Sequence, residues 1–377
     1  MTRARDVANV LTAANVLATD TETAAAISTH AAAADPHTGY LKESEFNSSG
    51  KNFLINGGFD IWQRGTSGTF TNSPTWTPDR WWGCVSGGAP TCTISRQTAD
   101  TIGFNYGARF GRNSGQTGVG TVYFGQTLET SESKLLAGKT ITVSFYAKSG
   151  TNAPTPLYVG VYTGTGTDQS TNTLFNGGGW TSTGQVNNGI TVTSTMTRYN
   201  VQMAISSNVT QVMLYFAYTS SGTAGANEWF QIEGVQLEIG STATSFSRAG
   251  GDIQSELAKC QRYYEQSAAA GTVLSEGMSA TVNGVASAYS GSDMRSQRFD
   301  FKVTKRAVPT MTYYRSNDSA TNGRWVYYVN GWTTPNSTSN GLVGYDSFNV
   351  YMTSSSAFTT RDCYIVEGGG WSASAEL

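Results

Sequence analysis

The chain has 377 residues, which is enough for two or three domains with buried cores. Charged residues make up 13% of it and the net charge is -2, so it offers little electrostatic attraction for nucleic acid or an anionic membrane. No apolar run approaches the ~20 residues that span a bilayer, so no membrane insertion is expected. The charges of Met1–Asp6 precede no signal-peptide-like apolar run, which predicts synthesis in a cytosol.

Residues 1–50 carry apolar side chains at helical spacing. One predicted helix begins after Asp6, and a second begins at Thr21 and ends before Pro36. Neither helix is long enough to be stable alone in water. We therefore expect an alanine-rich arm that forms a thin helical bundle between identical chains, and the alternative is a disordered arm.

Residues 30–41 contain the pattern H…DPHTGYL. It resembles a segment of the tail fibres and receptor-binding proteins of bacterial viruses, and this resemblance implies an arm that attaches the protein to a tail. Two interpretations of His37 stay open. Its ring hydrogen-bonds the backbone of the turn at Asp35–Pro36, or it meets its symmetry mates around a three-fold axis and holds a metal.

Residues 51–250 contain several short alternating segments separated by glycine-rich turns, with no long helix between them. In Thr140–Lys148 the residues expected to point inward are Ile141, Val143, Phe145 and Ala147. Aromatic residues reach 12% of the chain, and together with its 43 glycines they favour short strands and tight turns over disorder. The pattern predicts an antiparallel sandwich or jelly roll.

Cys84 and Cys92 flank the segment Val85–Pro90, which predicts a hairpin turn that would bring the two thiols face to face. Because synthesis in a cytosol is expected, we predict reduced thiols, and a disulfide formed after release is the alternative. The spacing of the 4 cysteines fits no zinc site.

The last predicted strand of this domain lies within Glu228–Phe246 and changes phase midway. Phe230 and Ile232 share one face, and the alternation restarts one position late at Val235. The slip falls at Glu233–Gly234, where one extra residue would make a β-bulge. We expect this strand to close the domain.

Four segments of this block, in this order, resemble the carbohydrate-binding-module-like jelly roll of phage tail proteins: NFLINGGFDIWQRG, PDRWW, ITVSFYAKSG and WFQIEGVQLEIGSTATSF. Sugar-binding relatives often hold a structural calcium ion near their first and last strands, and the matching carboxylates here are Asp60 and Glu238. Calcium needs about six to eight oxygen ligands, so most would have to come from the backbone. Plain surface carboxylates are the alternative, and no cofactor is otherwise required.

Gly250–Gly251 marks a linker to residues 251–377. Asp252 is placed to cap a short helix from Ile253 to Gln266, within ELAKCQRYYEQS, which also resembles a segment of phage tail proteins. The alternating segments that follow predict a smaller sandwich that forms a tip. The expected fold is therefore mainly all-β, with two antiparallel β-sandwich or jelly-roll domains (51–250 and 251–377) preceded by a short N-terminal α-helical arm (1–50).

No enzymatic activity is expected. Both histidines, His30 and His37, lie in the arm, which excludes a Ser-His-Asp or Cys-His arrangement within the β-domains. A polysaccharide hydrolase needs two carboxylates about 5–10 Å apart, and the sequence does not show whether two of its sparse acidic residues converge. Depolymerising tailspikes usually carry a long parallel β-helix, and no such repeat is present.

Tryptophan and tyrosine side chains are the candidate sugar contacts, because sugars stack their C–H faces on aromatic rings. Trp180 lies in the glycine-rich loop Asn176–Thr183 and is expected to be exposed. In the C-terminal domain the candidates, which lie among Asn, Ser and Thr, are Trp325, Tyr327, Trp332 and Tyr345. The alternative is that such rings fill the core or subunit interfaces, the role expected of Trp62, Trp81 and Trp82.

The resemblance and the composition together predict a tail-fibre protein of a virion that mediates adsorption to the host cell surface by binding a surface polysaccharide. Such fibres are generally homotrimers assembled in the host cytoplasm, and three copies would strengthen weak single sites. The arm is expected to dock onto a tail nozzle, adaptor or baseplate protein. The alternatives are a purely structural tail or baseplate component and a glycan-degrading tailspike.

Overall fold

The computed structural model describes residues 28–29, 51–279, 281–316, 323–328, 331–354, 358–359 and 362–377. Contacts divide the chain into two compact units, Met1–Ser48 and Ser49–Leu377. In the first unit only Ser28 and Thr29 are described, and both are helical and exposed. The predictions for the rest of the N-terminal arm and for His37 lie outside the described residues.

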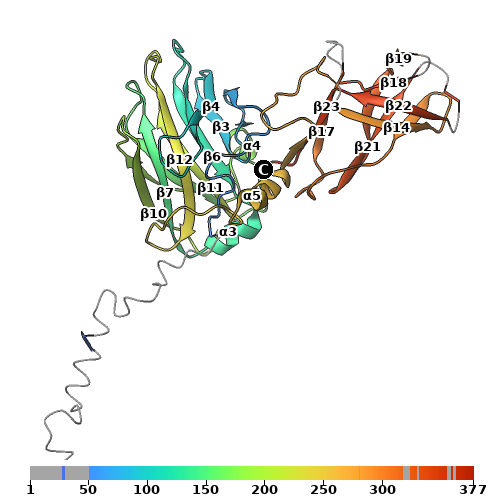
Figure 1. Ribbon diagram of the computed structural model, residues 1–377. Coiled ribbons are helices and arrows are strands. Elements are labelled where there is room, and N and C mark those ends of the chain that lie inside the picture. The colour runs from blue at the N-terminus through green and yellow to red at the C-terminus, as the bar shows by residue number, and fades with distance from the viewer. Residues whose placement is uncertain are drawn as a thin grey trace, which may run out of the picture. The chain divides into compact units, whose positions relative to one another are not determined.

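Residues 51–250 form two antiparallel sheets that face each other across one core (Figure 1). The first sheet has the strand order β1 (Ser67–Phe70), β4 (Cys92–Thr98), β5 (Tyr106–Arg112), β12 (Trp229–Ile239), β7 (Thr140–Ser149) and β10 (Thr197–Ala204). The second has the order β2 (Thr75–Trp76), β3 (Trp82–Gly87), β6 (Gly120–Thr127), β11 (Gln211–Thr219), β8 (Leu157–Gly164) and β9 (Gly184–Ile190). This arrangement confirms the predicted sandwich.

The alternation of β7 places its apolar side chains between the two sheets as predicted. Ile141, Val143, Phe145 and Ala147 are all buried in this core, together with Trp62 and Trp81. Trp82 is also buried, but it lies in a separate cluster on the outer face of the second sheet. The prediction that these three tryptophans are packing residues is confirmed for the described residues.

The phase change in β12 is a β-bulge, as predicted. β12 pairs with β7 on one side, and the register shifts between Glu233 and Gln236. Gly234 has a φ of +55°, and a Cβ at this position would lie 2.3 Å from the ring of Phe104. Glycine is therefore required here both by the backbone conformation and by the neighbouring ring.

The predicted hairpin between Cys84 and Cys92 is wrong. β3 pairs with β2 and β6, whereas β4 pairs with β1 and β5, so the segment between them crosses from one sheet to the other. Both cysteines are buried and free. Burial raises the pKa of each thiol to about 12, so both stay protonated at neutral pH.

Three short helices lie within the described part of residues 51–377: α3 (Thr130–Leu136), α4 (Thr171–Asn176) and α5 (Ile253–Gln261). Asp252 caps α5 by accepting hydrogen bonds from the backbone of Gln254 and Ser255, as its position predicts. The helix ends at Gln261 instead of Gln266, because residues 264–266 pair with a strand at the end of the chain. None of the helices in the described residues has the length and apolar character needed to cross a membrane.

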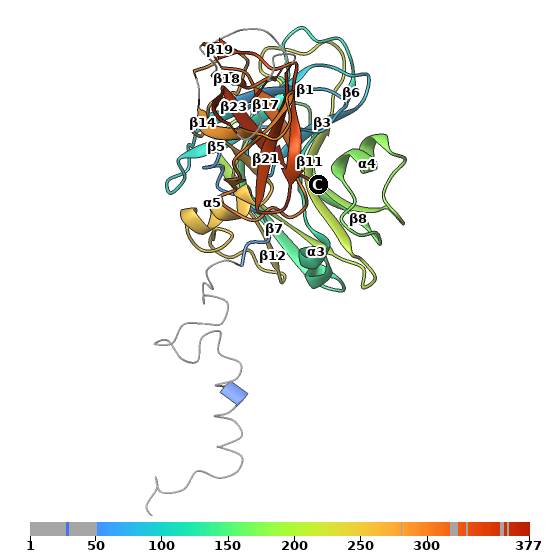
Figure 2. The same cartoon turned by 90° about the vertical axis from the view of Figure 1, so that its right-hand side faces the viewer.

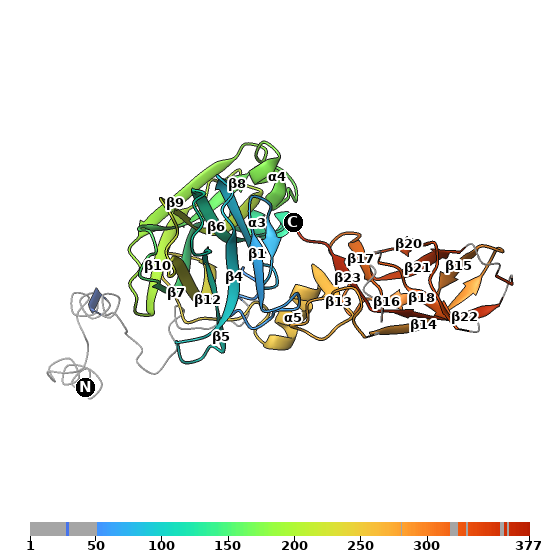
Figure 3. The ribbon, with the colours of Figure 1, turned by 90° about the horizontal axis from the view of Figure 1, so that it is seen from above.

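In the described part of residues 251–377 two further sheets enclose a second core (Figure 3). The small sheet has the order β13 (Tyr264–Gln266), β23 (Gly370–Ser374) and β17 (Thr310–Tyr314). The large sheet has the order β16 (Phe299–Asp300), β21 (Ser347–Thr353), β15 (Asp293–Ser296), β14 (Val282–Ala288), β22 (Cys363–Gly368), β18 (Val326–Tyr328) and β19 (Trp332–Thr333), and β20 (Ser337–Val343) also pairs with β21. The chain is thus mainly β and contains two antiparallel sandwiches.

Candidate functional site

Two of the predicted ligand contacts are core residues of the C-terminal sandwich. Trp325 and Tyr327 are 0% and 1% exposed. A Cβ at Gly368 would lie 2.5 Å from the Trp325 indole, so a glycine is needed to make room for the ring. The Tyr327 hydroxyl is satisfied by Ser354 at 2.7 Å. Rings held in this way have no surface to offer to a sugar, which corrects the prediction for both residues.

Trp180 is 4% exposed, so the expectation that its glycine-rich loop exposes it is wrong. The loop after α4 folds back onto the outer face of the sheet that contains β11. The indole N–H of Trp180 donates to the carbonyl of Ser170 at 2.9 Å, and the ring packs in a cluster with Tyr215 and Trp82. Trp180 therefore fastens the α4 segment to the sheet.

α4 lies beside the strands of this sheet (Figure 2), and Phe175 of α4 packs against an aromatic cluster on the sheet. The ring centroid of Phe175, in α4, lies 4.9 Å from that of Tyr123 and 5.4 Å from that of Trp82. Tyr215 lies beside them, with its hydroxyl accepting from the Gln185 amide at 2.6 Å. The aromatic side chains of this outer face therefore pack under α4 and are not open to a ligand.

The two carboxylates proposed for calcium are engaged by protein donors. Asp60 Oδ2 lies 2.6 Å from the guanidinium of Arg248, and Oδ1 accepts from the Asn105 amide at 2.9 Å. Glu238 accepts from the backbone N–H and the hydroxyl of Thr244 at 2.9 and 2.6 Å. In the described part of the chain no group of three or more His, Cys, Asp or Glu is arranged to hold a metal ion. These contacts do not favour a calcium site, since Arg248 already supplies the cation beside Asp60.

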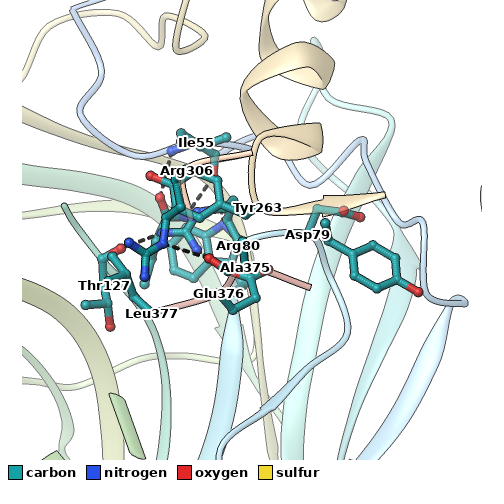
Figure 4. A network of polar contacts seen from close by, with 12 residues as sticks. Ile55, Asp79, Arg80, Thr127, Tyr263, Arg306, Ala375, Glu376 and Leu377 are labelled. Carbon is teal, nitrogen blue, oxygen red and sulfur yellow. Dashed lines mark hydrogen bonds and ion pairs between the residues drawn. The ribbon is translucent and has the colours of Figure 1, made fainter. Parts of the chain in front are cut away.

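A buried network of charged groups lies where the last residues of the chain meet the jelly roll (Figure 4). Arg80 is ion-paired with Glu376, donates to the carbonyl of Thr127 at 2.6 Å and lies 3.5 Å from the ring centroid of Tyr263. Arg64 holds the other Glu376 oxygen at 2.8 Å. Burial opposes ionisation of Glu376, but Arg80 and Arg64 hold its pKa below the usual range. With both oxygens bound to arginines, this carboxylate acts as a structural link and is poorly placed for acid–base chemistry.

Trp332 and Tyr345 are the predicted aromatic residues that reach the surface, with exposed fractions of 53% and 54%. The structure does not bring them together. Tyr345 follows β20 and precedes β21, whereas Trp332 lies in β19 at the opposite edge of the large sheet. Five strand spacings of ~4.8 Å separate β21 from β19, which is about 24 Å.

Trp332 belongs instead to a row of exposed side chains that crosses four neighbouring strands. Val285 of β14 pairs with Ile365 of β22, Ile365 pairs with Tyr328 of β18, and Tyr328 pairs with Trp332. Directly paired residues of an antiparallel sheet point to the same side, so these four form one stripe, here called the outer row. Their exposed fractions are 47%, 55%, 48% and 53% in that order.

The outer row is an apolar surface that the described part of the chain leaves open. The rings of Tyr328 and Trp332 meet edge to face, with centroids 5.5 Å apart. The opposite side of the same strands packs in the core, where Ala286, Val366 and Tyr327 are buried. A contiguous exposed apolar surface of this kind marks a binding site more often than scattered apolar residues do.

The same side of the sheet becomes polar beyond β14. Ser287 pairs with Arg295 of β15, and Arg295 pairs with Tyr351 of β21. Hydrogen bonds from Ser290 and Tyr351 hold the pKa of Asp293 below its usual range. The pKa of Tyr351 is raised to about 12 by its hydrogen bonds to Tyr289 and Asp293. Near neutral pH the polar side of the sheet therefore presents the ionised carboxylate of Asp293. The hydroxyls of Ser290 and Tyr351, which are held by hydrogen bonds, and the guanidinium of Arg295 lie beside it.

Sequence reasoning found Trp332 and missed its three partners in the row. Tyr328 follows Tyr327 directly, and only the alternation of a strand tells which of the two rings is buried. Ile365 and Val285 are ordinary strand residues, and their exposure becomes visible only when the register of β14, β22 and β18 is known. This face presents flat rings, apolar side chains and, on one side, polar groups.

The comparisons with known proteins give partial structural likenesses, and none of them carries an argument about this chain. No protein-family profile matches the sequence, and no curated protein matches it. Half of the chain superposes on 21% of the tailspike protein 4 enzymatically active domain of bacteriophage CBA120, with 14% identity and a TM-score of 0.31. Half superposes on 99% of TmCBM61 in complex with β-1,4-galactotriose, with 12% identity and a TM-score of 0.28. Half also superposes on 100% of a putative sugar-binding protein from Bacteroides thetaiotaomicron, with 14% identity and a TM-score of 0.32.

Proposed function

We propose that this chain is a glycan-binding protein of a virus tail and that it binds a surface polysaccharide of the host through the outer row. The observation that carries the proposal is the continuous stripe of Val285, Ile365, Tyr328 and Trp332, each about half exposed and in register. Sugar rings have apolar C–H faces that stack on such rings, and their hydroxyls need donors and acceptors like those beside β15 and β21.

The wider assignment rests on the sequence patterns that resemble phage tail proteins. In this proposal the N-terminal arm docks onto a tail nozzle, adaptor or baseplate protein, and three copies present three outer rows to one surface. Such multivalency raises the apparent affinity of weak single sites. No catalytic step is part of the proposal, and no calcium ion is needed for it.

The test measures binding of the full chain, labelled with a fluorophore, to a panel of bacterial strains with different surface polysaccharides. We expect saturable binding to at least one strain. The double variant Tyr328→Ala, Trp332→Ala should bind that strain at least tenfold more weakly, because both rings are lost. Leu342→Ala is the matched control, since Leu342 is 66% exposed and lies on β20, outside the outer row.

Each of the other outcomes counts against the proposal in a defined way. Undiminished binding of the double variant would move the site away from the outer row. Binding to no strain favours a purely structural tail component. Shortened polysaccharide chains after incubation, detected by size-exclusion chromatography, favour a glycan-degrading spike.

A further inference from the structure

A cavity of about 590 Å³ lies between the jelly roll and α5, and none of its lining residues belongs to the large C-terminal sheet that carries the outer row. Its volume is within the range of ~300–1,000 Å³ that is usual for ligand pockets. Its walls come from the segment before β1, from β4 and β5, from the start of α5 and from the loop after β13. The polar lining residues are Asp60, Arg96, Asn105, Arg248 and Asp252, and the apolar ones include Ile61, Trp62, Tyr106, Ile253 and Leu257.

The polar groups of the cavity are held in place by one another. Arg248 lies 2.6 Å from Asp60 and 3.1 Å from Glu256, so one guanidinium bridges two carboxylates. Asn105 donates to the second oxygen of Asp60 at 2.9 Å. The Asp60 side chain is only 8% exposed, and Asp60 is one of the residues that line the cavity.

One wall combines a guanidinium with an aromatic ring. The Arg96 guanidinium lies 4.4 Å from the ring centroid of Tyr106, and among the described residues no carboxylate lies within 4.0 Å of it. Its N–H groups are therefore available to a ligand. Trp62 and Ile61, both buried, supply an apolar floor next to this wall.

The charges that line the cavity balance, because Arg96 and Arg248 are matched by Asp60 and Asp252. Such a lining attracts neither an anion nor a cation strongly. It offers acceptors at Asp60, donors at Arg96 and Asn105, and an apolar surface between them. We propose that this cavity is a second binding site and that its ligand is a neutral sugar ring, whose hydroxyls both donate and accept while its C–H face is apolar.

The test uses the full chain and ligand-observed saturation-transfer NMR with methyl α-glucoside, methyl α-galactoside and methyl α-mannoside as probes. We expect saturation of at least one of them. Ala270→Trp should reduce the signal at least fivefold, because Ala270 lines the cavity and the larger ring fills it. Arg96→Ala should reduce it by removing the free donors while leaving the space open.

Two controls separate this site from the outer row. Ile102→Ala should leave the signal unchanged, because Ile102 is fully exposed in the turn between β4 and β5 and does not line the cavity. The double variant Tyr328→Ala, Trp332→Ala should still show saturation that Ala270→Trp removes. Unchanged melting temperatures would show that the variants are folded.

The proposal fails if none of the three neutral glycosides is saturated by the wild-type chain. It also fails if Ala270→Trp and Arg96→Ala both leave the signal intact. Stronger saturation of methyl α-glucuronide than of methyl α-glucoside would overturn the neutral ligand class. Because the residues differ, any of these results leaves the cell-binding test of the outer row unaffected.

Discussion

The outer face of the jelly-roll sheet around β11 and the outer face of the large C-terminal sheet carry similar aromatic residues but differ in what covers them. On the first, the α4 segment places Phe175 and Trp180 over Trp82 and its neighbours. On the second, the outer row has no such cover in the described part of the chain, and Trp332 is 53% exposed. Residue type therefore does not tell which of these aromatic side chains are exposed, whereas the presence of a covering segment does.

Ion pairs among the described residues range from buried to exposed. The ion pair of Arg80 and Glu376, at the jelly roll, leaves its side chains 2% and 4% exposed, whereas Arg298 and Asp300 of the C-terminal sandwich form a pair with 62% and 68% exposed side chains. A buried pair is strongly destabilising to break because the remaining charge stays unpaired. An exposed pair contributes little, typically below about 1 kcal/mol. Buried pairs occur in both sandwiches, since Lys305 and Glu265 of the C-terminal one leave their side chains only 0% and 2% exposed.

The largest expected effect is a difference in unfolding free energy between alanine variants of two adjacent tyrosines of β18. Tyr327→Ala removes a ring that is 1% exposed and leaves a cavity, which typically costs about 3–5 kcal/mol for an aromatic residue. Tyr328→Ala removes a ring that is 48% exposed and should cost less than about 1 kcal/mol. Urea unfolding followed by circular dichroism measures both free energies.

Tyr327→Phe is the control for the buried ring, since it removes only the hydrogen bond to Ser354 and should cost about 1 kcal/mol. Equal losses for the two alanine variants would show that the two faces of this sheet do not differ in burial. The division between core and outer row would then be lost.

A pH-dependent effect is expected on the jelly-roll side of the comparison. Asp79 is 1% exposed, and burial raises its pKa from 3.8 to about 6, even though Gln63 donates to both of its oxygens. The folded chain therefore holds this proton more tightly than the unfolded chain. Protonation of Asp79 therefore contributes to the free energy of unfolding. This contribution is fully present below about pH 4 and is lost as the pH rises through 6, by at most about 3 kcal/mol.

The measurement compares the unfolding free energies of wild type and Asp79→Asn at pH 4.5, 6 and 7.5. The difference between them isolates Asp79 from other groups, including Glu376, whose lowered pKa acts in the opposite direction and at lower pH. We expect wild type to lose stability relative to Asp79→Asn as the pH rises. A constant difference across this range would contradict the raised pKa.

The sandwich architecture could be predicted from the sequence because strand alternation is a local signal. β7 has its four predicted inward residues in the core, and the phase slip in β12 marks a real bulge at Gly234. Both features depend on residues next to each other in the chain. The predicted α5 extended too far because pairing of Tyr264 with Ser374, more than 100 positions away, ends the helix.

The candidate site could be predicted only in part, since exposure depends on contacts between distant segments. Trp180 lies between glycines that suggest an open loop, yet Ser170 and the sheet beneath bury it. Trp332 was found because it lies among polar residues, but Ile365 could join it only through strand pairing that no local pattern encodes. Cover by a distant segment and strand register decide which of these residues are exposed, and both depend on contacts between parts of the chain that are far apart in sequence.

The smallest expected change in unfolding free energy tests whether the α4 segment shields the aromatic cluster of the jelly-roll sheet. Phe175 is partly buried, and its side chain shields the rings of Trp82, Tyr123 and Tyr162. Phe175→Ala should cost only about 1 kcal/mol in unfolding free energy, since burial of a complete phenylalanine side chain contributes about 1.5–3 kcal/mol and this one is incomplete. It should also leave binding through the outer row unchanged.

Tyr158→Ala is the matched control for Phe175→Ala, because Tyr158 is 37% exposed and lies on β8 of the same sheet but outside the aromatic cluster. Acrylamide should quench tryptophan fluorescence more strongly in Phe175→Ala than in this control, since the variant uncovers Trp82, whose indole N–H has no hydrogen-bond partner in the described structure. A loss of more than about 3 kcal/mol would instead place Phe175 in the jelly-roll core. Equal quenching in both variants would show that α4 does not shield the sheet, and the contrast between a covered and an open aromatic face would no longer hold.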